Sequence, residues 1–299
     1  MAQRTICVQS PAKMHVKNSA LVLSGSHAEM TVPLDDIWVI VVENRQVVIT
    51  ASLLAAFAEA GIGVIVCGAD HMPCALQLPL GAHSRHSGIV EQQLLISKPL
   101  KKQLWQRIVK AKINNQARCL DYLGLTGADA LYGYAKSVAS DDSTGREAVA
   151  AAYYFRRLLS EGTRREGPYA APLDYGYAII RAGIGREAVS KGWLVSRGLH
   201  HCNELNSFNL VDDLIEPFRP VVDLLVCEDQ LFVTFDKESR ARLSSVFEYC
   251  VLVNGKRHSV QSAIAELLAS LKRAVLEKNA ELISLPELIP LRRIEVDKR

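Results

Sequence analysis

One short segment at the start of the last third of the chain concentrates side chains that can bind a metal ion or move a proton. His200 and His201 stand together, and the acids Asp212, Asp213 and Glu216 follow. On a helix, residues three and four positions apart lie on one face, so Glu216 would share a face with both aspartates. Carboxylate and imidazole ligands suit Mg²⁺ or Mn²⁺ better than thiolates do. The segment therefore predicts a site for a hard divalent cation, and its sequence alone does not choose between the two histidines.

This segment also has less specific interpretations. A polar loop before an acidic first helical turn would have the same composition, because a helix N-terminus attracts negative charge. Pro217 would end or kink that helix, since proline lacks the amide hydrogen and its ring clashes with the preceding turn. Cys202 beside His201 is a poor candidate for nucleophilic catalysis, because adjacent residues rarely point at one another as nucleophile and base must.

A further candidate carboxylate occurs in a pentapeptide that the chain contains twice. Glu147 lies in Gly-Arg-Glu-Ala-Val at residues 145–149, and Glu187 lies in the same five residues at 185–189. Small residues follow Glu147 and would let a neighbouring helix approach and half-bury the acid. A glutamate in a first helical turn is equally well explained by the helix dipole. The local sequence therefore does not distinguish Glu147 from Glu187.

Two other groups of residues are candidates for binding a metal ion or nucleic acid. Cys67, His71 and Cys74, with His83 or His86, have a spacing that fits no common zinc pattern. Basic residues could form a surface that follows DNA phosphates, although a solvated, salt-bridged face would have the same composition. They are Lys101, Lys102, Arg107, Lys110, Lys112 and Arg118 on one predicted helix, together with Arg156, Arg157, Arg164 and Arg165.

The composition is that of an ordinary globular protein. The chain has 299 residues, of which 49% are hydrophobic and 22% charged, with a formal net charge of +3. A length of roughly 150 residues per domain predicts two domains. Seven cysteines without a C-x-x-C pair argue against a disulfide framework and favour a reducing compartment. No apolar run approaches the ~20 residues of a membrane helix, so a cytoplasmic location is expected.

The fold class predicted is α+β, with a small N-terminal β-domain at residues 1–82. Short β-branched runs between turn residues predict strands at 5–8, 15–17, 21–23, 30–32 and 37–42, arranged as a meander or small sandwich. Thr50 is a candidate N-cap for a helix over 51–60. A buried strand is expected at 64–67.

Residues 83–95 are predicted to be a polar linker, and residues 96–299 a larger all-α catalytic domain. Leu104, Trp105 and Ile108 begin an apolar face with helical period. Further helices are expected around 146–160, 176–195, 220–228, 238–250 and 260–278, with a hairpin at Asn254-Gly255. The last dozen residues read as a frayed basic tail.

Taken together, these segments resemble the CRISPR-associated integrase, the universal endonuclease of spacer acquisition, and its type II branch most. The resemblance covers nearly the whole chain. Its motifs are Arg146-Glu147-Ala148, Leu173-x-Tyr175-Gly176-Tyr177, His201-x-Asn203-x-x-Asn206-x-Phe208-Asn209-Leu210, and Asp213-Leu-x-Glu216-Pro-Phe-Arg219-Pro.

The resemblance implies that Glu147, His201 and Glu216 are both the catalytic residues and the ligands of Mg²⁺ or Mn²⁺. It prefers His201 over His200 and makes Glu187 a chance repeat. One position departs from the family, which usually has asparagine where this chain has Asp174. An added carboxylate there would change metal affinity or local packing.

The resemblance also implies an activity and an assembly. The activity is insertion of new spacers into a CRISPR array, for antiviral defence, by attack of a DNA 3′-hydroxyl on repeat DNA. The assembly is a homodimer formed through the β-domains, with two such dimers around a dimer of a small ferredoxin-like adaptation protein. Two alternatives stay open: a stand-alone metal-dependent nuclease for branched DNA in repair, and a non-catalytic DNA-binding scaffold.

Overall fold

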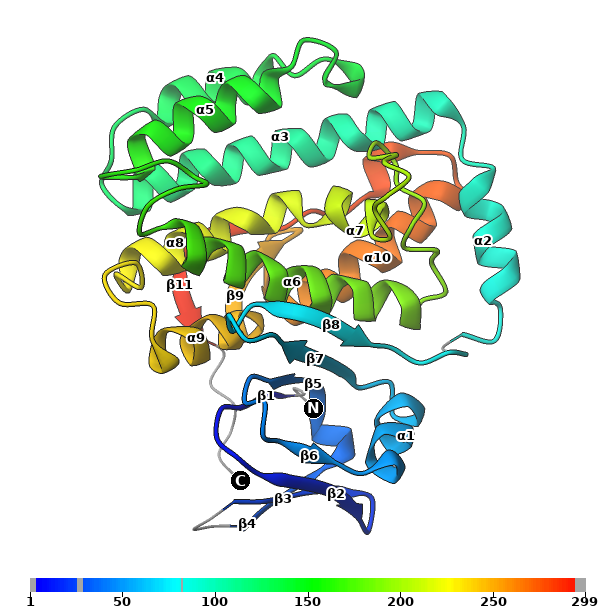
Figure 1. Ribbon diagram of the computed structural model, residues 1–299. Helices are drawn as coiled ribbons and strands as arrows, with labels where there is room; N and C mark the ends of the chain where they lie inside the picture. Colours follow the sequence, from blue (N-terminus) through cyan, green and yellow to red (C-terminus); the bar gives the residue numbers. More distant parts are fainter. Residues whose placement is uncertain (1–3, 26–28, 82, 294–299) are drawn as a thin grey trace. The chain divides into compact units, whose positions relative to one another are not determined.

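The computed structural model describes residues 4–25, 29–81 and 83–293, and the chain divides after Ser84 into two compact units (Figure 1). The first unit is rich in strands and the second is mostly helical, in agreement with the predicted fold class. Within the described residues no helix combines the length and the apolar character needed to cross a membrane.

The first unit contains two four-stranded sheets. One has the order β1 (Arg4–Val8), β5 (Ile37–Val42), β7 (Gly63–Cys67) and β8 (Pro73–Gln77), parallel except for β8. The other has the order β4 (Glu29–Pro33), β3 (Ala20–Ser24), β2 (Lys13–Lys17) and β6 (Val48–Ile49). All six residues of β5 are buried, which explains why this strand is continuously apolar and does not alternate.

The predicted strands and the predicted helix of the first unit are confirmed. The meander lies in β2, β3 and β4, which pair antiparallel in sequence order. Helix α1 (Ala51–Glu59) begins where Thr50 Oγ1 accepts a hydrogen bond from the Leu53 amide at 3.3 Å. Its Leu53 and Phe57 enter the core beside Met14 and Leu21. Strand β8 was missed, because its sequence has no β-branched residue.

The second unit contains nine described α-helices and one small sheet. The helices are α2 (His86–Leu94), α3 (Lys98–Tyr122), α4 (Ala128–Lys136), α5 (Arg146–Leu158), α6 (Ala170–Ser190), α7 (Asn209–Leu214), α8 (Arg219–Glu228), α9 (Lys237–Ser244) and α10 (Val260–Leu276). The sheet has the order β10 (Lys256–Ser259), β9 (Tyr249–Val253), β11 (Glu287–Arg293), and the predicted hairpin is β9–β10. The unit is therefore mostly helical but not all-α.

Two segments differ from their predictions. Most of the predicted linker is helix α2, where Gln93 is buried and donates hydrogen bonds to the carbonyls of Leu194 (3.0 Å) and Arg197 (2.7 Å). The helix was missed because polar residues dominate its sequence and its glycine reads as a break. The predicted tail is strand β11 up to Arg293, paired with β9. Residues 294–299 lie outside the described part of the chain.

Helix α3 is the long element on which the second unit is built. Ser97 caps its first turn, accepting a hydrogen bond from the Leu100 amide at 3.4 Å. Its buried face carries polar residues among the apolar ones: Asn115 donates to the carbonyls of Pro217 (2.8 Å) and Pro286 (2.9 Å). Lys112 lies on this same face and is 7% exposed. The prediction that Lys112 lies on a solvent-facing basic surface was wrong.

Candidate active site

A buried aspartate holds the histidine-bearing loop in one geometry. Asp213 on α7 is fully buried and accepts hydrogen bonds from the amides of Leu199 (2.6 Å), His200 (3.1 Å) and His201 (3.1 Å). It also contacts Nδ1 of the His201 ring at 2.7 Å. When Nδ1 carries the proton and donates to the carboxylate, Nε2 keeps its lone pair for a ligand.

The asparagines of this segment shape the loop. Asn209 donates to the carbonyls of Ser196 (3.1 Å), Asn203 (2.9 Å) and Asn206 (3.1 Å). Gly198 lies so close to the loop that a Cβ there would meet Asp213 Oδ2 at 2.7 Å. These contacts explain why the segment is dense in asparagine without requiring any asparagine to bind a cation.

The prediction that Asp212, Asp213 and Glu216 share one face of a helix was wrong. Helix α7 stops at Leu214, a 3₁₀ turn η3 (Glu216–Phe218) contains Pro217, and α8 then begins, as the proline predicted. The break sends the acids in different directions. Asp212 pairs with Arg181 at 2.6 Å, Asp213 holds the histidine loop, and Glu216 forms an ion pair with Lys112 on α3.

Glu147 is positioned at the first turn of α5 by another carboxylate. Asp142 accepts hydrogen bonds from the Arg146 amide at 2.8 Å and from the Glu147 amide at 2.9 Å. Asp141, Asp142 and Gly145 all have left-handed backbone conformations, with φ of 63°, 47° and 63°. Such strain is typical of functional loops, where the surrounding contacts must hold it in place.

Lys112 connects the two glutamates and was missed as a site residue. Its Nζ lies 2.6 Å from Glu147 Oε1 and also forms an ion pair with Glu216 Oε2. Glu216 Oε1 accepts from Arg219 Nε at 2.8 Å. The sequence did contain a signal for its burial: Lys112 comes four residues after Ile108 and therefore lies on the apolar face of the predicted helix.

The charges around Glu216 determine its ionisation. Burial raises the pKa of this carboxyl, but Lys112 and Arg219 outweigh burial and lower the pKa to about 2. Burial lowers the pKa of Lys112, but the charges of Glu216 and Glu147 outweigh burial, and the pKa of Lys112 is raised. The hydrogen bond to Asp213 raises the pKa of His201 against the effect of burial. Both Glu216 and Lys112 are therefore charged at neutral pH.

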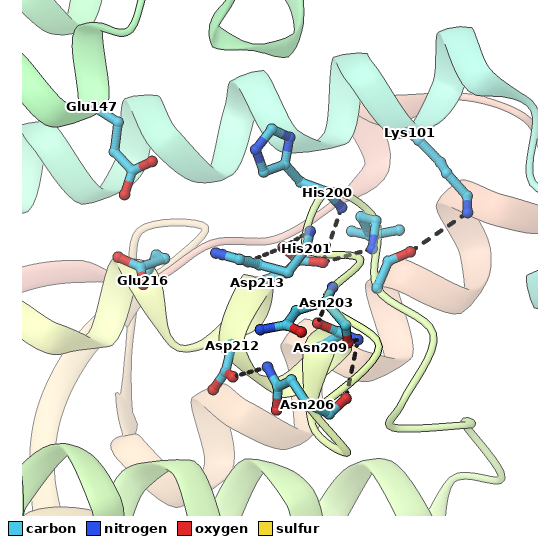
Figure 2. A network of polar contacts seen from close by, with 12 residues as sticks. Lys101, Glu147, His200, His201, Asn203, Asn206, Asn209, Asp212, Asp213 and Glu216 are labelled. Atoms are coloured by element: carbon cyan, nitrogen blue, oxygen red, sulfur yellow. Dashed lines mark hydrogen bonds and ion pairs between the residues drawn. The ribbon is translucent and has the colours of Figure 1, made fainter.

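Figure 2 shows how the predicted site residues lie: Glu147, His201 and Glu216 face one another from three separate segments. His200 has other partners, since it stacks on Trp105 at 4.3 Å between ring centroids and contacts Asp141 at 3.4 Å. Glu187 belongs to a different ion pair, with Arg186 at 2.5 Å.

Asp174 lies in a cavity that also reaches Glu216. It pairs with Arg164 at 2.5 Å, and both residues line a cavity of about 480 Å³ together with Lys112, Arg219 and Glu216. Asp174 thus neutralises one arginine of this cavity, whereas Glu216 pairs with Lys112 and Arg219.

The donor set fits a hard divalent cation, although the ligands are not yet arranged around one. Among the described residues, no three His, Cys, Asp or Glu side chains form a ready metal site, and this includes the cysteines and histidines considered for zinc. In the candidate site, the Lys112 ammonium lies between Glu147 and Glu216. Glu147 and Glu216 already share one cation, the Lys112 ammonium, and Asp213 orients the imidazole of His201. Such carboxylate and imidazole ligands suit Mg²⁺ or Mn²⁺.

A buried carboxyl connects the helices behind this site. Asp223 on α8 accepts hydrogen bonds from Tyr154 on α5, at 2.9 Å, and from Tyr177 on α6. Its burial raises its pKa to about 6, although the two tyrosines act in the opposite direction. The Tyr177 ring lies 4.6 Å from the guanidinium carbon of Arg219, the partner of Glu216. The network therefore joins the helix of Glu147 to the side chains around Glu216.

Asp223→Asn should stabilise the protein at neutral pH and leave its stability at pH 4 nearly unchanged. The native protein holds the Asp223 proton more tightly than the unfolded chain, in which the pKa of this carboxyl is 3.8. The stability that protonated Asp223 contributes is therefore complete below pH 3.8 and is lost as pH rises through the native pKa of about 6. The loss is of the order of 3 kcal/mol. Urea unfolding of both proteins between pH 4 and 8 measures it, and equal pH slopes would contradict the assignment.

Comparison with solved structures defines the class of fold. A casposase bound to integration product matches with a TM-score of 0.74 and 16% identity, over 93% of this chain and 92% of that one. A CAS1 protein from Thermotoga maritima matches with a TM-score of 0.68 and 16% identity, over 91% and 97%. The fold is that of Cas1 proteins and of this casposase.

The sequence then shows the family. Residues 6–230 match the family described as CRISPR associated protein Cas1. The chain is 38% identical over 304 aligned positions to the CRISPR-associated endonuclease Cas1 of Neisseria meningitidis serogroup C, covering 99% of this chain and all of that protein. A second relative, from Pyrobaculum aerophilum, is 29% identical over 69% of this chain. The chain belongs to the Cas1 family.

Proposed function

We propose that this protein is a metal-dependent DNA endonuclease and integrase that inserts new spacers into a CRISPR array. The observation that carries the proposal is that Glu147, Glu216 and His201 face one another in a chain of the Cas1 family. The two glutamates share the buried ammonium of Lys112. A full-length relative is named an endonuclease, and one structure of the same fold is a casposase bound to integration product. The proposed reaction is attack of a DNA 3′-hydroxyl on a phosphodiester of repeat DNA.

The chain's own residues would hold the reacting groups. Glu147 and Glu216 would bind Mg²⁺ or Mn²⁺ through carboxylate oxygens, and His201 through Nε2. When bound, the ion would lower the pKa of the attacking hydroxyl and neutralise charge on the phosphate. Asp213 keeps His201 in one tautomer and orientation, which limits the reorganisation needed during the reaction. Arg219 contacts the Glu216 oxygen that Lys112 does not contact.

The surroundings of the site favour a DNA substrate. A cavity of about 410 Å³ beside His201 is lined by Lys101 and Arg197, and the cavity beside Glu216 is lined by Arg165 and Arg219, besides the Arg164 that Asp174 pairs. Positive side chains in both cavities suit a phosphate backbone that passes through the site. Solved relatives include a Cas1 of this fold bound to DNA and a Cas6-RT-Cas1–Cas2 complex.

We propose the assembly expected for the family. The first unit would form a homodimer, and two dimers would flank a dimer of the small adaptation protein. The fold similarity to a chain of a Cas6-RT-Cas1–Cas2 complex, 36% of which is covered, supports such a partner.

A half-site integration assay tests the function. Purified protein is incubated with a branched DNA substrate and Mn²⁺ or Mg²⁺, with and without the small partner, and strand-joined products are separated on a denaturing gel. Glu216→Ala and His201→Ala should each lose at least about 100-fold in joining rate. His200→Ala, whose ring faces Trp105 and Asp141, is the matched control and should lose less than about tenfold.

The same assay separates the alternatives. Metal-dependent cleavage without joining, with or without the partner, would indicate a branched-DNA nuclease. DNA binding without any chemistry, unchanged by Glu216→Ala, would indicate a scaffold. Joining that survives His201→Ala and is lost with His200→Ala would mean that the wrong histidine was assigned.

A further inference from the structure

The position of Lys112 suggests a role beyond that of an ordinary ion pair. The residue is 7% exposed, and its ammonium touches one oxygen of each glutamate that the proposed function assigns to the metal. Neighbouring Val109 and Ile113 are fully buried, so the helix cannot swing this side chain into solvent as a unit. Asn115 ties the same helix to the Pro217 carbonyl, one residue after Glu216. The fold therefore delivers the ammonium to the glutamate pair.

The energetics give no reason to keep this arrangement for stability alone. Removing charges from water is costly, and a buried ion pair often contributes no more to stability than apolar residues of the same volume. The arrangement does satisfy an electrostatic need, because two carboxylates this close would otherwise repel each other. One ammonium and the Arg219 guanidinium together balance both negative charges.

We propose that the Lys112 ammonium is an internal cation that keeps Glu147 and Glu216 in position and that a divalent ion must displace it before binding both. The inference rests on the proposed function, since it takes the two glutamates to be metal ligands. An ion bound to both carboxylates would use the space and the oxygens that Nζ now contacts. The lysine therefore lowers the affinity for metal in the free protein.

The displaced ammonium would then need a new partner. Its flexible four-carbon stem lets Nζ move by a few ångströms while the helix stays fixed. A DNA phosphate that enters the site supplies that partner, because it brings negative charge to the place where the ammonium lost it. Metal and DNA should consequently bind with positive coupling, each raising the affinity for the other by the same factor.

Calorimetric titration with Mn²⁺ tests this in the full-length protein. Lys112→Gln removes the positive charge and should bind Mn²⁺ at least about tenfold more tightly than wild type, which corresponds to about 1.4 kcal/mol. Lys112→Arg keeps the charge and should bind no more tightly than wild type. The matched control is Lys110→Gln on the same helix, which lines cavities that do not include either glutamate and should leave the affinity unchanged.

A second titration, in the presence of a short DNA duplex, tests the coupling. DNA should raise the Mn²⁺ affinity of wild type severalfold and that of Lys112→Gln much less. Equal or weaker Mn²⁺ binding by Lys112→Gln in the absence of DNA would overturn the proposal.

The outcomes also separate this inference from the proposed function. If a Glu147→Gln, Glu216→Gln double variant loses Mn²⁺ binding while Lys112→Gln gains none, the metal site stands and the role of Lys112 is wrong. If the double variant binds Mn²⁺ as wild type does, the metal site itself is wrong. Should Lys112→Gln unfold without metal, thermal unfolding in Mn²⁺ and in chelator replaces the titration. A larger Mn²⁺-induced rise in Tm than in wild type supports the proposal, and an equal or smaller rise overturns it.

Discussion

Glu147→Gln should lower the rate of strand joining by at least about 100-fold, whereas Glu187→Gln should change it by less than about threefold. Both residues lie in the same pentapeptide, but only Glu147 reaches the cation that Glu216 also contacts. Glutamine keeps the length of the side chain and removes the charge that a divalent ion requires. The measurement is the initial rate of half-site integration at saturating DNA.

The pair of variants is its own control for the local sequence. Glu187 is buried with Arg186, so its variant reports what an unrelated loss of an ion pair does to the activity. Circular dichroism on both variants ensures that folded protein is compared. A rate that falls with Glu187→Gln and survives Glu147→Gln would transfer the metal site to the other copy of the pentapeptide.

Asp213→Ala should produce the largest loss of stability among substitutions in the histidine segment, of about 3–5 kcal/mol. The change would leave three buried backbone amides and the His201 ring without their acceptor, and each unsatisfied buried group is costly. The free energy of unfolding of a typical domain is about 5–15 kcal/mol, so the variant should unfold at a much lower urea concentration than the wild type. Strand joining should fall as well, because His201 loses its orientation.

The neighbouring Asp212→Ala is the matched control for this prediction. Asp212 precedes Asp213 on the same short helix but pairs with the partly exposed Arg181. An ion pair of that kind contributes about 0–1 kcal/mol. Equal urea midpoints for the two variants would mean that the hydrogen bonds of Asp213 do not hold the loop.

Strong local patterns accounted for most of the fold. The β-branched runs of the first unit and the helical period of residues 104–120 correspond to strands and to α3, because burial on one or both faces determines these patterns directly. The elements that were missed have weak patterns. Helix α2 is polar, β8 has no β-branched residue, and β11 depends on pairing with the distant strand β9, which leaves little trace in the local sequence.

The candidate site was only partly predictable, for two physical reasons. A charged residue on a predicted helix is normally solvent-exposed, so Lys112 was grouped with surface lysines although it is buried against two glutamates. The spacing of Asp213 and Glu216 suggested one helical face, but Pro217 breaks the helix and the two acids serve different partners. Three-dimensional pairing also separates Glu147 from Glu187, which are identical in local sequence.

The stack of His200 on Trp105 gives the protein an optical reporter beside the proposed site residues. Trp105 is 1% exposed and also meets the ring of His201 edge-on, at 5.6 Å between centroids. An indole shielded from water emits at short wavelength, and a stacked imidazole quenches that emission, more strongly when it is protonated. In a variant that keeps Trp105 and replaces Trp38 and Trp193 with phenylalanine, the emission intensity would follow the histidine loop in real time. Stopped-flow fluorescence could then resolve the order in which metal and nucleic acid arrive.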